Sequence, residues 1–411
     1  MTATETPILD FPSIPLDNYA AVVGQSEIDE LRALARPLRA ATVRMVNSTA
    51  VGGGVAELLN RLVPMMRELD IDANWDVMTG NSAFFEVTKA FHNALHGAAY
   101  AGTGSDFGTF EATNRSNVGT GHEDAEFTVI HDPQPLGLID ARRPGPNRWV
   151  WRCHIDLSRP NPAVWAYLER LVLRYDGAIF SSPAFARQLA IPQYLFYPSI
   201  DPLSEKNRDL PAEIVTGVLT RYGIDAGRPI VTQISRFDRL KDPVGVVRAY
   251  RLVKRFCDCQ LVLAGGSASD DPEGSEVLEE TREAAGSDPD IHILELPPSV
   301  PLEINALQRA SSVVVQKSLR EGFGLTVAEA LWKKKPVVAS AVGGIPTQVI
   351  HKHTGLLAHS VEGTAYQVRY LLMHPHIAAR LGEQGHEHVR EELLITGNLK
   401  RYLTLFLHLR G

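Results

Sequence analysis

The chain has 411 residues, 44% of them hydrophobic and 22% charged, with a formal net charge of −7. This composition is typical of a globular protein with two domains or one large one, and it excludes a disordered or collagen-like chain. The acidic balance argues against a nucleic-acid partner. Because the N-terminal stretch lacks the features of a signal peptide and no run approaches about 18 apolar residues, we expect a cytoplasmic protein with no membrane partner.

Metal and disulfide chemistry find little support in the sequence. Three cysteines occur, at Cys153, Cys257 and Cys259. An odd, sparse set argues against a disulfide framework, and the spacing of the last two is tighter than that of a zinc loop. His351 and His353 are separated by one lysine, but no third ligand is in view. We therefore predict no metal site.

Apolar residues recur at helix or strand spacing through the first two hundred residues. The pattern predicts helices over 26–38, 55–69, 84–95 and 162–173, and strands over 42–47, 75–78, 127–130, 149–153 and 178–181. Between residues 196 and 210 the chain turns polar and is interrupted by prolines, which is typical of a linker.

Beyond this linker the alternation of strands and helices starts again. The pattern predicts strands over 230–234, 260–264, 291–294, 312–315 and 337–339, and helices over 244–256, 275–285, 302–310, 325–332 and on to the C-terminus. Alternation of this kind implies right-handed crossovers and parallel sheets. The sequence therefore predicts an α/β protein with two doubly wound, Rossmann-like domains facing a cleft, and motif residues at the carboxyl ends of strands.

A glycine-rich turn follows the first predicted strand. Gly52, Gly53 and Gly54 open the next helix, where free N–H groups favour a phosphate and glycine allows a close backbone approach. The pattern matches neither the dinucleotide-binding fingerprint nor the Walker loop. A tight strand-to-helix turn without a ligand is the alternative interpretation.

Two cations follow the first strand of the second half, in SRFDRLKDP. Arg236 and Lys241 suit a diphosphate, because arginine grips two oxygens and lysine acts as a point charge. The alternative is a pair of solvated surface cations, and the nearby Asp238 and Asp242 could partly neutralise them.

Two carboxylates stand eight positions apart in REGFGLTVAEAL. Glu321 precedes a Gly-Phe-Gly turn that ends at Gly324, and Glu329 lies on the following helix. A carboxylate in the loop suits sugar hydroxyls, one on the helix suits a ribose diol, and the N–H groups near Leu325 and Thr326 suit a diphosphate. Solvated carboxylates are the alternative.

Together, E-G-F-G-L-x-x-x-E, S-R-F-D-x-x-K-D-P and the later GGIP resemble the retaining nucleotide-sugar glycosyltransferases of the GT-B fold. The runs VNSTAVGGGVAELL, FFEVTKAFHNALHG and VIHDPQPLGL are similar to the trehalose glycosyltransferring synthases. The resemblance implies an acceptor-side domain over 1–200, a nucleotide-sugar domain over 201–395, and a C-terminal helix over 396–411 that packs back on the first domain.

The activity implied is transfer of glucose from ADP- or UDP-glucose to free glucose, giving α,α-trehalose with retention, in a reversible reaction. The nucleotide sugar is then a substrate, no cofactor is required, and a divalent metal is dispensable. A retaining trehalose phosphorylase is the enzymatic alternative, and a catalytically inactive regulator that binds sugars or nucleotides is the non-enzymatic one. Nucleobase preference, direction, acceptor breadth and oligomeric state, with a homodimer as one option, stay open.

The resemblance also implies roles for the motif residues. Arg236 and Lys241 neutralise the departing diphosphate, Glu321 holds the glucosyl hydroxyls, and Glu329 binds the ribose. Among the remaining donor-binding candidates are backbone positions in both halves: Gly53, Gly54, Gly324, Leu325 and Thr326. His131, at the end of a predicted strand, contacts the donor sugar, with packing at a strand end as its alternative.

The acceptor-side candidates are residues of the first half with hydrogen-bonding side chains: Lys89, His92, Asp132, Arg152 and Asp156. Lys89 and His92 share a helix face that is either a pocket wall or solvated, and Arg152 and Asp156 follow a strand and are either sugar contacts or structural. Asp132 would be the nucleophile of a double displacement, but we expect a front-face reaction without one. Lys333, Lys334 and Lys335 are interpreted as a solvated helix end.

Overall fold

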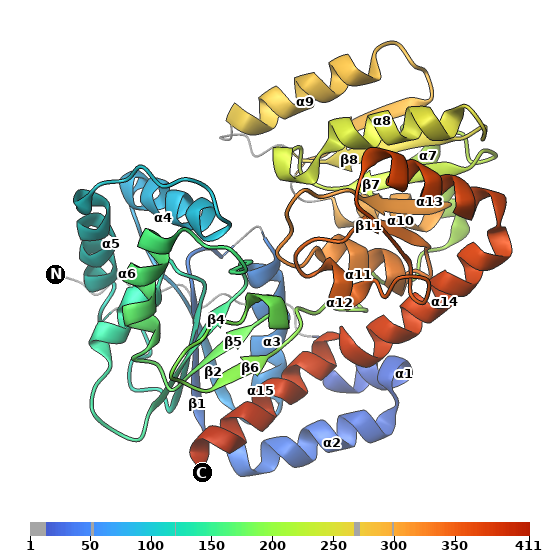
Figure 1. The fold of residues 1–411 in the computed structure, drawn as a ribbon. Coiled ribbons are helices and arrows are strands. Elements are labelled where there is room, and N and C mark those ends of the chain that lie inside the picture. Colours follow the sequence, from blue (N-terminus) through green and yellow to red (C-terminus); the bar gives the residue numbers. More distant parts are fainter. Residues whose placement is uncertain (1–13, 51–52, 120, 267–271, 298–299) are drawn as a thin grey trace. The chain divides into compact units, whose positions relative to one another are not determined.

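The computed structural model describes residues 14–50, 53–119, 121–266, 272–297 and 300–411 (Figure 1). The chain divides into two compact units, the first ending at Ser199 and taking in Ile395–Gly411 as well, the second running from Ile200 to Leu394. Each unit contains one six-stranded sheet in which every strand pairing is parallel. The predicted α/β architecture with two doubly wound sheets is confirmed.

The sheet of the first unit has the strand order β2-β1-β3-β4-β5-β6. Its strands are β1 (Thr42–Asn47), β2 (Asp72–Val77), β3 (Phe127–His131), β4 (Arg148–Cys153), β5 (Gly177–Phe180) and β6 (Gln193–Leu195). The helices and 3₁₀ turns before Ser199 are η1 (Leu16–Tyr19), α1 (Ala20–Val23), α2 (Gln25–Ala35), η2 (Arg36–Leu38), α3 (Gly54–Glu68), α4 (Ser82–Leu95), α5 (Gly104–Ser116), η3 (Leu136–Ala141), α6 (Pro162–Val172) and η4 (Pro183–Phe185).

The last helix, α15 (Ile395–Arg410), packs on the first unit. The ring of Phe406 stacks on that of Phe127 in β3 with centroids 4.7 Å apart, and Lys400 Nζ lies 2.6 Å from a carboxylate oxygen of Glu30 in α2. Both ends of the first unit's chain are therefore needed to build its core.

The sheet of the second unit has the order β12-β11-β10-β7-β8-β9. Its strands are β7 (Ile230–Ile234), β8 (Gln260–Gly265), β9 (Ile291–Glu295), β10 (Val313–Gln316), β11 (Val337–Ser340) and β12 (Leu356–Ala358). Its helices and its 3₁₀ turn are α7 (Ala212–Arg221), η5 (Arg239–Lys241), α8 (Pro243–Lys254), α9 (Pro272–Ala285), α10 (Pro301–Ala310), α11 (Leu325–Trp332), α12 (Ile345–Gln348), α13 (Val361–Met373) and α14 (Pro375–Glu392).

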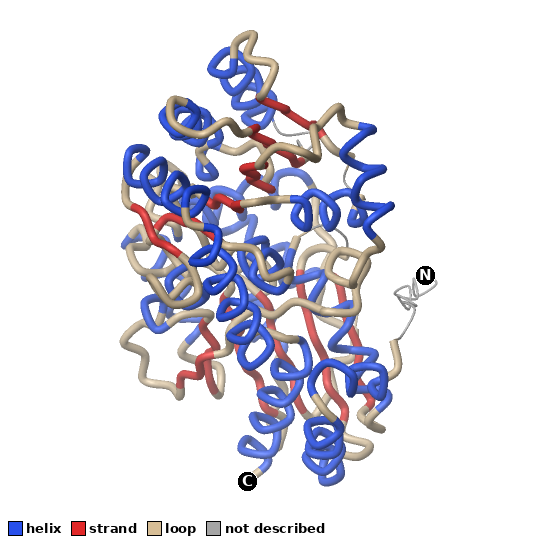
Figure 2. The backbone as a smooth tube through the Cα atoms, turned by 90° about the vertical axis from the view of Figure 1, so that its right-hand side faces the viewer, coloured by secondary structure: helices blue, strands red, loops and turns tan. Residues whose placement is uncertain are grey.

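The second sheet is apolar on both faces, which is why its strands read as nearly continuous hydrophobic runs. Leu261 and Leu263 pack in a cluster with α8 and α13, whereas Val262 and Ala264 pack in another with α7 and α10. Because successive side chains of a strand point to opposite faces, this alternation places helices on both sides of the sheet (Figure 2).

Most predicted elements are present, with ends shifted by a few residues. The pattern missed α5, α7 and the short strands β6 and β12. α5 is polar and contains two glycines, so it carries no strong helical stripe, whereas α7 directly follows the stretch interpreted as a linker and contains Gly217. β6 and β12 have three residues each, too few to show an alternation.

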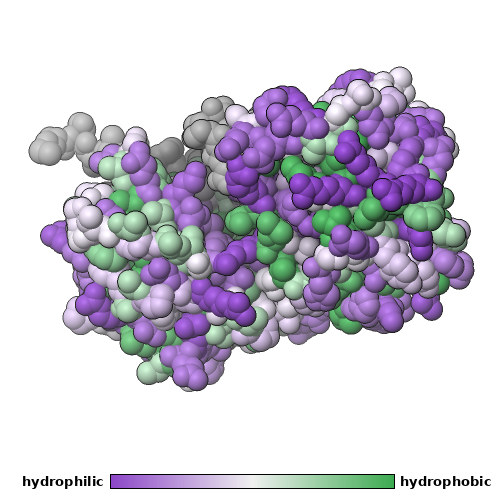
Figure 3. Space-filling view, turned by 45° about the horizontal axis from the view of Figure 1, so that its top comes forward, coloured by the Kyte–Doolittle hydropathy of each residue, from purple (hydrophilic) through white to green (hydrophobic). Residues whose placement is uncertain are grey.

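The visible face in Figure 3 is mostly hydrophilic, with apolar residues in small groups. Within the described ranges, no helix is long and apolar enough to cross a membrane.

In both sheets the chain reverses its direction of strand addition at one place, between β1 and β3 in the first and between β7 and β10 in the second. Ligands of doubly wound sheets bind outside the carboxyl ends of the strands at such switch points.

Candidate active site

The switch point of the second sheet brings together two of the predicted motifs. β10 pairs with β7, so the loop after Ile234 and the loop after Gln316 leave the sheet side by side. The amide of Leu319 donates to the carbonyl of Leu240 over 2.7 Å and joins the two loops directly.

Lys241 and Glu321 form an ion pair at this point. Lys241 Nζ donates to Glu321 Oε2 over 2.6 Å, and the same oxygen accepts hydrogen bonds from Ser318 Oγ at 3.0 Å and Gln316 Nε2 at 3.4 Å. Glu321 is only 7% exposed. Its other oxygen, Oε1, receives no hydrogen bond from the described residues, so one face of a positioned carboxylate remains available to a ligand.

Two buried glutamines hold these loops, and the sequence analysis missed both. Gln233 Nε2 donates to the carbonyl of Lys241 at 3.0 Å, while its Oε1 accepts from the amide of Lys317 at 2.9 Å. Gln316 Oε1 accepts from Thr326 Oγ1 at 3.1 Å. A polar amide near the end of an otherwise apolar strand was the signal that could have identified them.

Glycines let the Glu321 loop pack closely. Gly324 precedes α11 with φ of +81°, a conformation that favours glycine. Gly343, with φ of +55°, lies so near that a Cβ there would overlap the carbonyl oxygen of Glu321, and the amide of Gly344 donates to the carbonyl of Gly322 at 3.1 Å. The GGIP motif is therefore a support for the Glu321 turn.

Arg236 stands at the surface of the same site. It is exposed, with a side-chain exposure of 64%, and its Nη2 lies 3.3 Å from Asp238 Oδ2. Asp242 does not pair with Lys241: it binds Lys317 and caps α8 by accepting from the amide of Gly245 at 2.9 Å. Of the two acidic residues that were expected to neutralise these cations, only Asp238 pairs with one of them, Arg236.

Glu329 is buried, at 2% exposure, on α11. Its Oε1 lies 3.6 Å from Lys206 Nζ, and its Oε2 accepts from Gln308 Nε2 at 3.4 Å. Lys206 belongs to the polar stretch interpreted from the sequence as a linker, which gave no hint of a contact with the site. A buried carboxylate with a nearby cation and amide is a built polar site rather than a solvated helix face.

The expectation that Lys333 is solvated is wrong. Its side chain is 6% exposed, and its Nζ donates to Asn207 Oδ1 at 2.9 Å and to the carbonyl of Glu329 at 3.1 Å. Burial lowers the pKa of Lys333 to about 7. The segment around Asn207 covers this end of α11, and the sequence of the helix alone could not reveal that. Lys334, in contrast, is exposed as predicted.

In the first unit, the β1/β3 switch point carries the glycine turn and the histidine motif. Gly53 precedes α3 with φ of +83°, and both Gly53 and Gly54 are exposed; Gly52 lies outside the described residues. His131 ends β3 and is fully buried, with Nδ1 3.0 Å from Nε2 of His154. Burial lowers the pKa of His131 to about 3, so its ring is neutral at physiological pH.

Asp132 adopts a left-handed conformation, with φ of +65°, directly after β3. Its Oδ1 accepts from the amide of His154 at 2.8 Å, and its carbonyl accepts from Trp151 Nε1 at 3.0 Å. Burial raises the pKa of Asp132 to about 6. The carboxyl group thus fastens the β3 loop to the β4 loop.

The structure gives the local contacts of the remaining acceptor-side candidates. Arg152 is fully buried, and its Nη2 donates to the carbonyl of Phe196 at 2.6 Å, a contact that ties β4 to the residue after β6. Asp156 caps the amide of Ser158 at 2.8 Å. Lys89 is an exposed residue of α4, and the ring of His92 lies 4.7 Å from that of His96. Their roles in binding an acceptor stay predictions. In the part of the chain that the structure describes, no group of three metal-ligating side chains occurs.

Two family models match the chain, one for each half. The model for the N-terminal domain of trehalose synthase matches residues 45–187, and that for group 1 glycosyl transferases matches residues 220–388. The trehalose synthase of Thermococcus litoralis is 42% identical over 95% of this chain and 96% of its own, and that of Rubrobacter xylanophilus is 41% identical over 96% and 97%. The trehalose phosphorylase of Grifola frondosa is 27% identical, over 95% of this chain but 60% of its own.

Solved structures of low sequence identity share the fold. Sucrose-phosphate synthase from Thermosynechococcus elongatus matches with a TM-score of 0.70 at 18% identity, covering 90% of this chain and 99% of its own. An α,α-trehalose-phosphate synthase from Burkholderia xenovorans matches with a TM-score of 0.70 at 14% identity, covering 90% and 100%. Together with the two sheets, these similarities confirm the predicted GT-B class.

Proposed function

Because the chain belongs to the trehalose synthase family of glycosyltransferases, we propose that it makes α,α-trehalose by moving glucose from ADP- or UDP-glucose to free glucose. The chain is a hexosyltransferase by family, and the proposal adds the donor, the acceptor and retention at the transferred anomeric carbon. The observation that carries it is the Lys241–Glu321 pair at the β7/β10 switch point, where a cation lies beside a carboxylate whose Oε1 receives no hydrogen bond from the described residues.

On the donor side, each of these groups has one task. Lys241 keeps two N–H donors beyond the one directed at Glu321, and with Arg236 it neutralises the diphosphate as the bond to the anomeric carbon breaks. Glu321 Oε1 accepts a hydrogen bond from a glucosyl hydroxyl. The buried Glu329 binds the ribose diol, and the N–H groups at the start of α11, near Leu325 and Thr326, face the diphosphate.

The reaction proceeds on one face of the donor sugar. The bond from the anomeric carbon to the diphosphate oxygen breaks while the anomeric hydroxyl of glucose forms the new bond on the same face. The departing phosphate oxygen takes the proton of that hydroxyl, so no base is required from the protein. Asp132, which is bound to the amide of His154, is not needed as a nucleophile.

In the first unit, His131 supports the proposal as a neutral hydrogen-bonding group. Its Nε2 is buried and has no partner among the described residues, so a sugar hydroxyl could satisfy it. Gly53 and Gly54 offer exposed backbone N–H groups at the start of α3 to a phosphate. With two cations to neutralise the leaving group, the reaction does not depend on a divalent metal.

A panel of nucleotide-glucose donors with free glucose, analysed by chromatography, tests the proposal. We expect trehalose from ADP- or UDP-glucose in the presence of EDTA, and the reverse reaction from trehalose and the matching diphosphate. Release of glucose 1-phosphate from trehalose and inorganic phosphate, with no reaction from the nucleotides, would instead establish a phosphorylase.

A further inference from the structure

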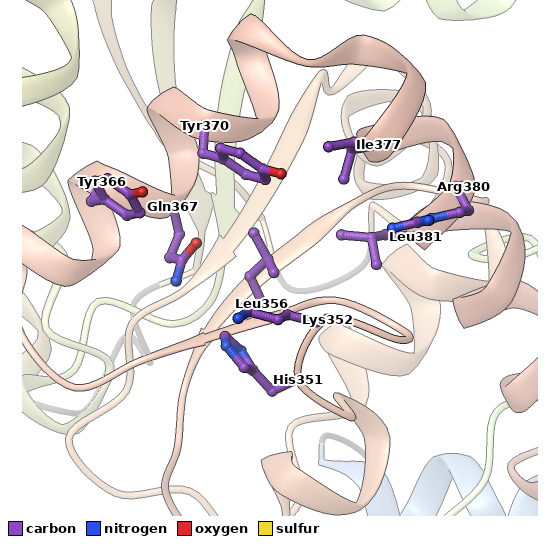
Figure 4. Close-up of a pocket in the computed structure, with 9 residues that line it drawn as sticks. All are labelled: His351, Lys352, Leu356, Tyr366, Gln367, Tyr370, Ile377, Arg380 and Leu381. Atoms are coloured by element: carbon purple, nitrogen blue, oxygen red, sulfur yellow. The ribbon is translucent and has the colours of Figure 1, made fainter.

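The second unit has a pocket of about 380 Å³ that none of the motifs accounts for (Figure 4). It is bounded by the turn at His351 and Lys352, by Leu356 at the start of β12, and by α13 and α14. Because all strands of this sheet are parallel, the start of β12 lies at the opposite edge from the carboxyl ends of β7 and β10. The pocket is therefore separate from the proposed donor site.

The pocket is cationic. Lys352 and Arg380 line it, no carboxylate does, and neither cation has an acidic partner in the described part of the chain. His351 Nδ1 accepts from the amide of Leu357 at 3.0 Å, so its proton is on Nε2 and that nitrogen is a donor. An anion is the ligand that this set of groups favours.

Lys352 is held in a backbone conformation that favours glycine. Its φ is +66°, in a turn closed by its own amide, which donates to the carbonyl of Gly355 at 2.8 Å. A lysine in the left-handed region is strained, and strained positions of this kind concentrate at ligand sites. Glycine would fit this turn better than Lys352 does, but the lysine places a cation beside the pocket.

The rest of the lining suits a sugar ring. Tyr370 crosses one side of the pocket, with Ile377 and Leu381 beside it and the Gln367 amide facing it from α13 (Figure 4). Aromatic and aliphatic surface covers the apolar face of a ring, and the amide, the tyrosine hydroxyl and the histidine N–H reach its hydroxyls. We propose that this pocket binds a phosphorylated sugar, free or as part of a nucleotide, with the phosphate on Lys352 and Arg380.

Isothermal titration of the full chain with glucose 6-phosphate, AMP and inorganic phosphate tests this proposal. We expect saturable binding of at least one of the two sugar phosphates, tighter than that of phosphate alone. Lys352→Gly and Arg380→Ala should each raise the Kd about tenfold, because each removes a charge-assisted hydrogen bond. Lys352→Gly should melt no lower than the wild type, since glycine suits the turn.

Lys334→Gly is the matched control. Lys334 is also a lysine with positive φ, +58°, but it pairs with Glu383 at 2.9 Å and does not line the pocket. This variant should bind as the wild type does, and so should Arg236→Ala, which weakens the proposed donor site. The proposal fails if neither sugar phosphate binds, if phosphate alone binds as tightly, if Arg236→Ala abolishes binding, or if Lys352→Gly behaves like Lys334→Gly.

Discussion

Lys241 and Glu321 are 80 positions apart in the chain, yet their side chains meet at 2.6 Å where β7 and β10 lie next to each other. The pair is partly buried, and Ser318 and Gln316 donate to the same carboxylate oxygen that Lys241 binds. A ligand that approaches the two loops therefore meets a fixed cation and a fixed carboxylate, and neither loop has to rearrange to bring them together.

Glu321→Ala should reduce turnover about 100-fold or more, because a contact to the glucosyl hydroxyls strengthens toward the transition state. Steady-state rates with the nucleotide-glucose donor measure this effect. Glu383→Ala, which removes a 62% exposed carboxylate of α14, is the control and should leave the rate unchanged. A Glu321→Ala protein with near-normal turnover would remove Glu321 from the site.

Glu329→Gln should act mainly on donor affinity. The buried carboxylate is proposed to accept from the ribose diol, and a neutral amide accepts more weakly. We expect KM for the nucleotide sugar to rise about tenfold with a smaller change in kcat. A selective loss of kcat at constant KM would contradict the ribose assignment.

Arg236→Ala and Lys241→Ala should each lose about 3 kcal/mol of transition-state stabilisation with the nucleotide donor. Arg239→Ala is a matched control, because Arg239 lies in the same loop but binds Glu280 and Glu276 of α9. Melting temperatures identify any folding defect. Active variants with collapsed melting temperatures would make the cations structural.

Asp132→Asn should keep a clearly measurable rate. Asparagine tolerates the left-handed conformation and can still accept from the amide of His154, so the loop geometry is preserved while the carboxylate is lost. Rate measurements together with intact-mass spectrometry in the presence of donor test this. A covalent glucosyl adduct on Asp132 in the wild type would establish a double displacement, and an inactive Asp132→Asn enzyme that still folds would contradict the expectation.

Lys333 should make stability rise with pH above neutrality. Its pKa is about 7 in the folded chain and 10.5 in its ordinary state, so between these values the unfolded chain binds more protons and stability increases with pH. The contribution is about 1 kcal/mol per pH unit between pH 7 and 9. Urea unfolding of the wild type and of Lys333→Met at both pH values measures it, and equal slopes for the two proteins would contradict the burial of a charge.

The sequence was informative wherever the local pattern is strong. β7 and α11 have the predicted bounds, and the two motif loops follow strands as expected, because a parallel strand of a doubly wound sheet is an apolar run followed by a functional loop. The three-residue strands β6 and β12 carry too little pattern to be found.

Contacts between residues that lie far apart in the sequence could not be predicted. The burial of Lys333 depends on the segment around Asn207 folding over α11, and the Lys206–Glu329 contact comes from the same segment. No periodicity links these positions. Likewise, the spacing of His131 and His154 gives no sign that the two rings meet, because β3 and β4 pair in a register that only the folded sheet defines.

Ile200 and Leu394 face each other in a parallel β-bridge, and the amide of Ile200 donates to the carbonyl of Leu393 at 2.9 Å. The chain therefore enters and leaves the second unit at one place, and that unit is a single uninterrupted segment, whereas the first unit is completed only by α15. During synthesis, which proceeds from the N-terminus, every residue of the second unit emerges from the ribosome before α15 does. The half of the molecule that is made first is thus the last to have all of its core.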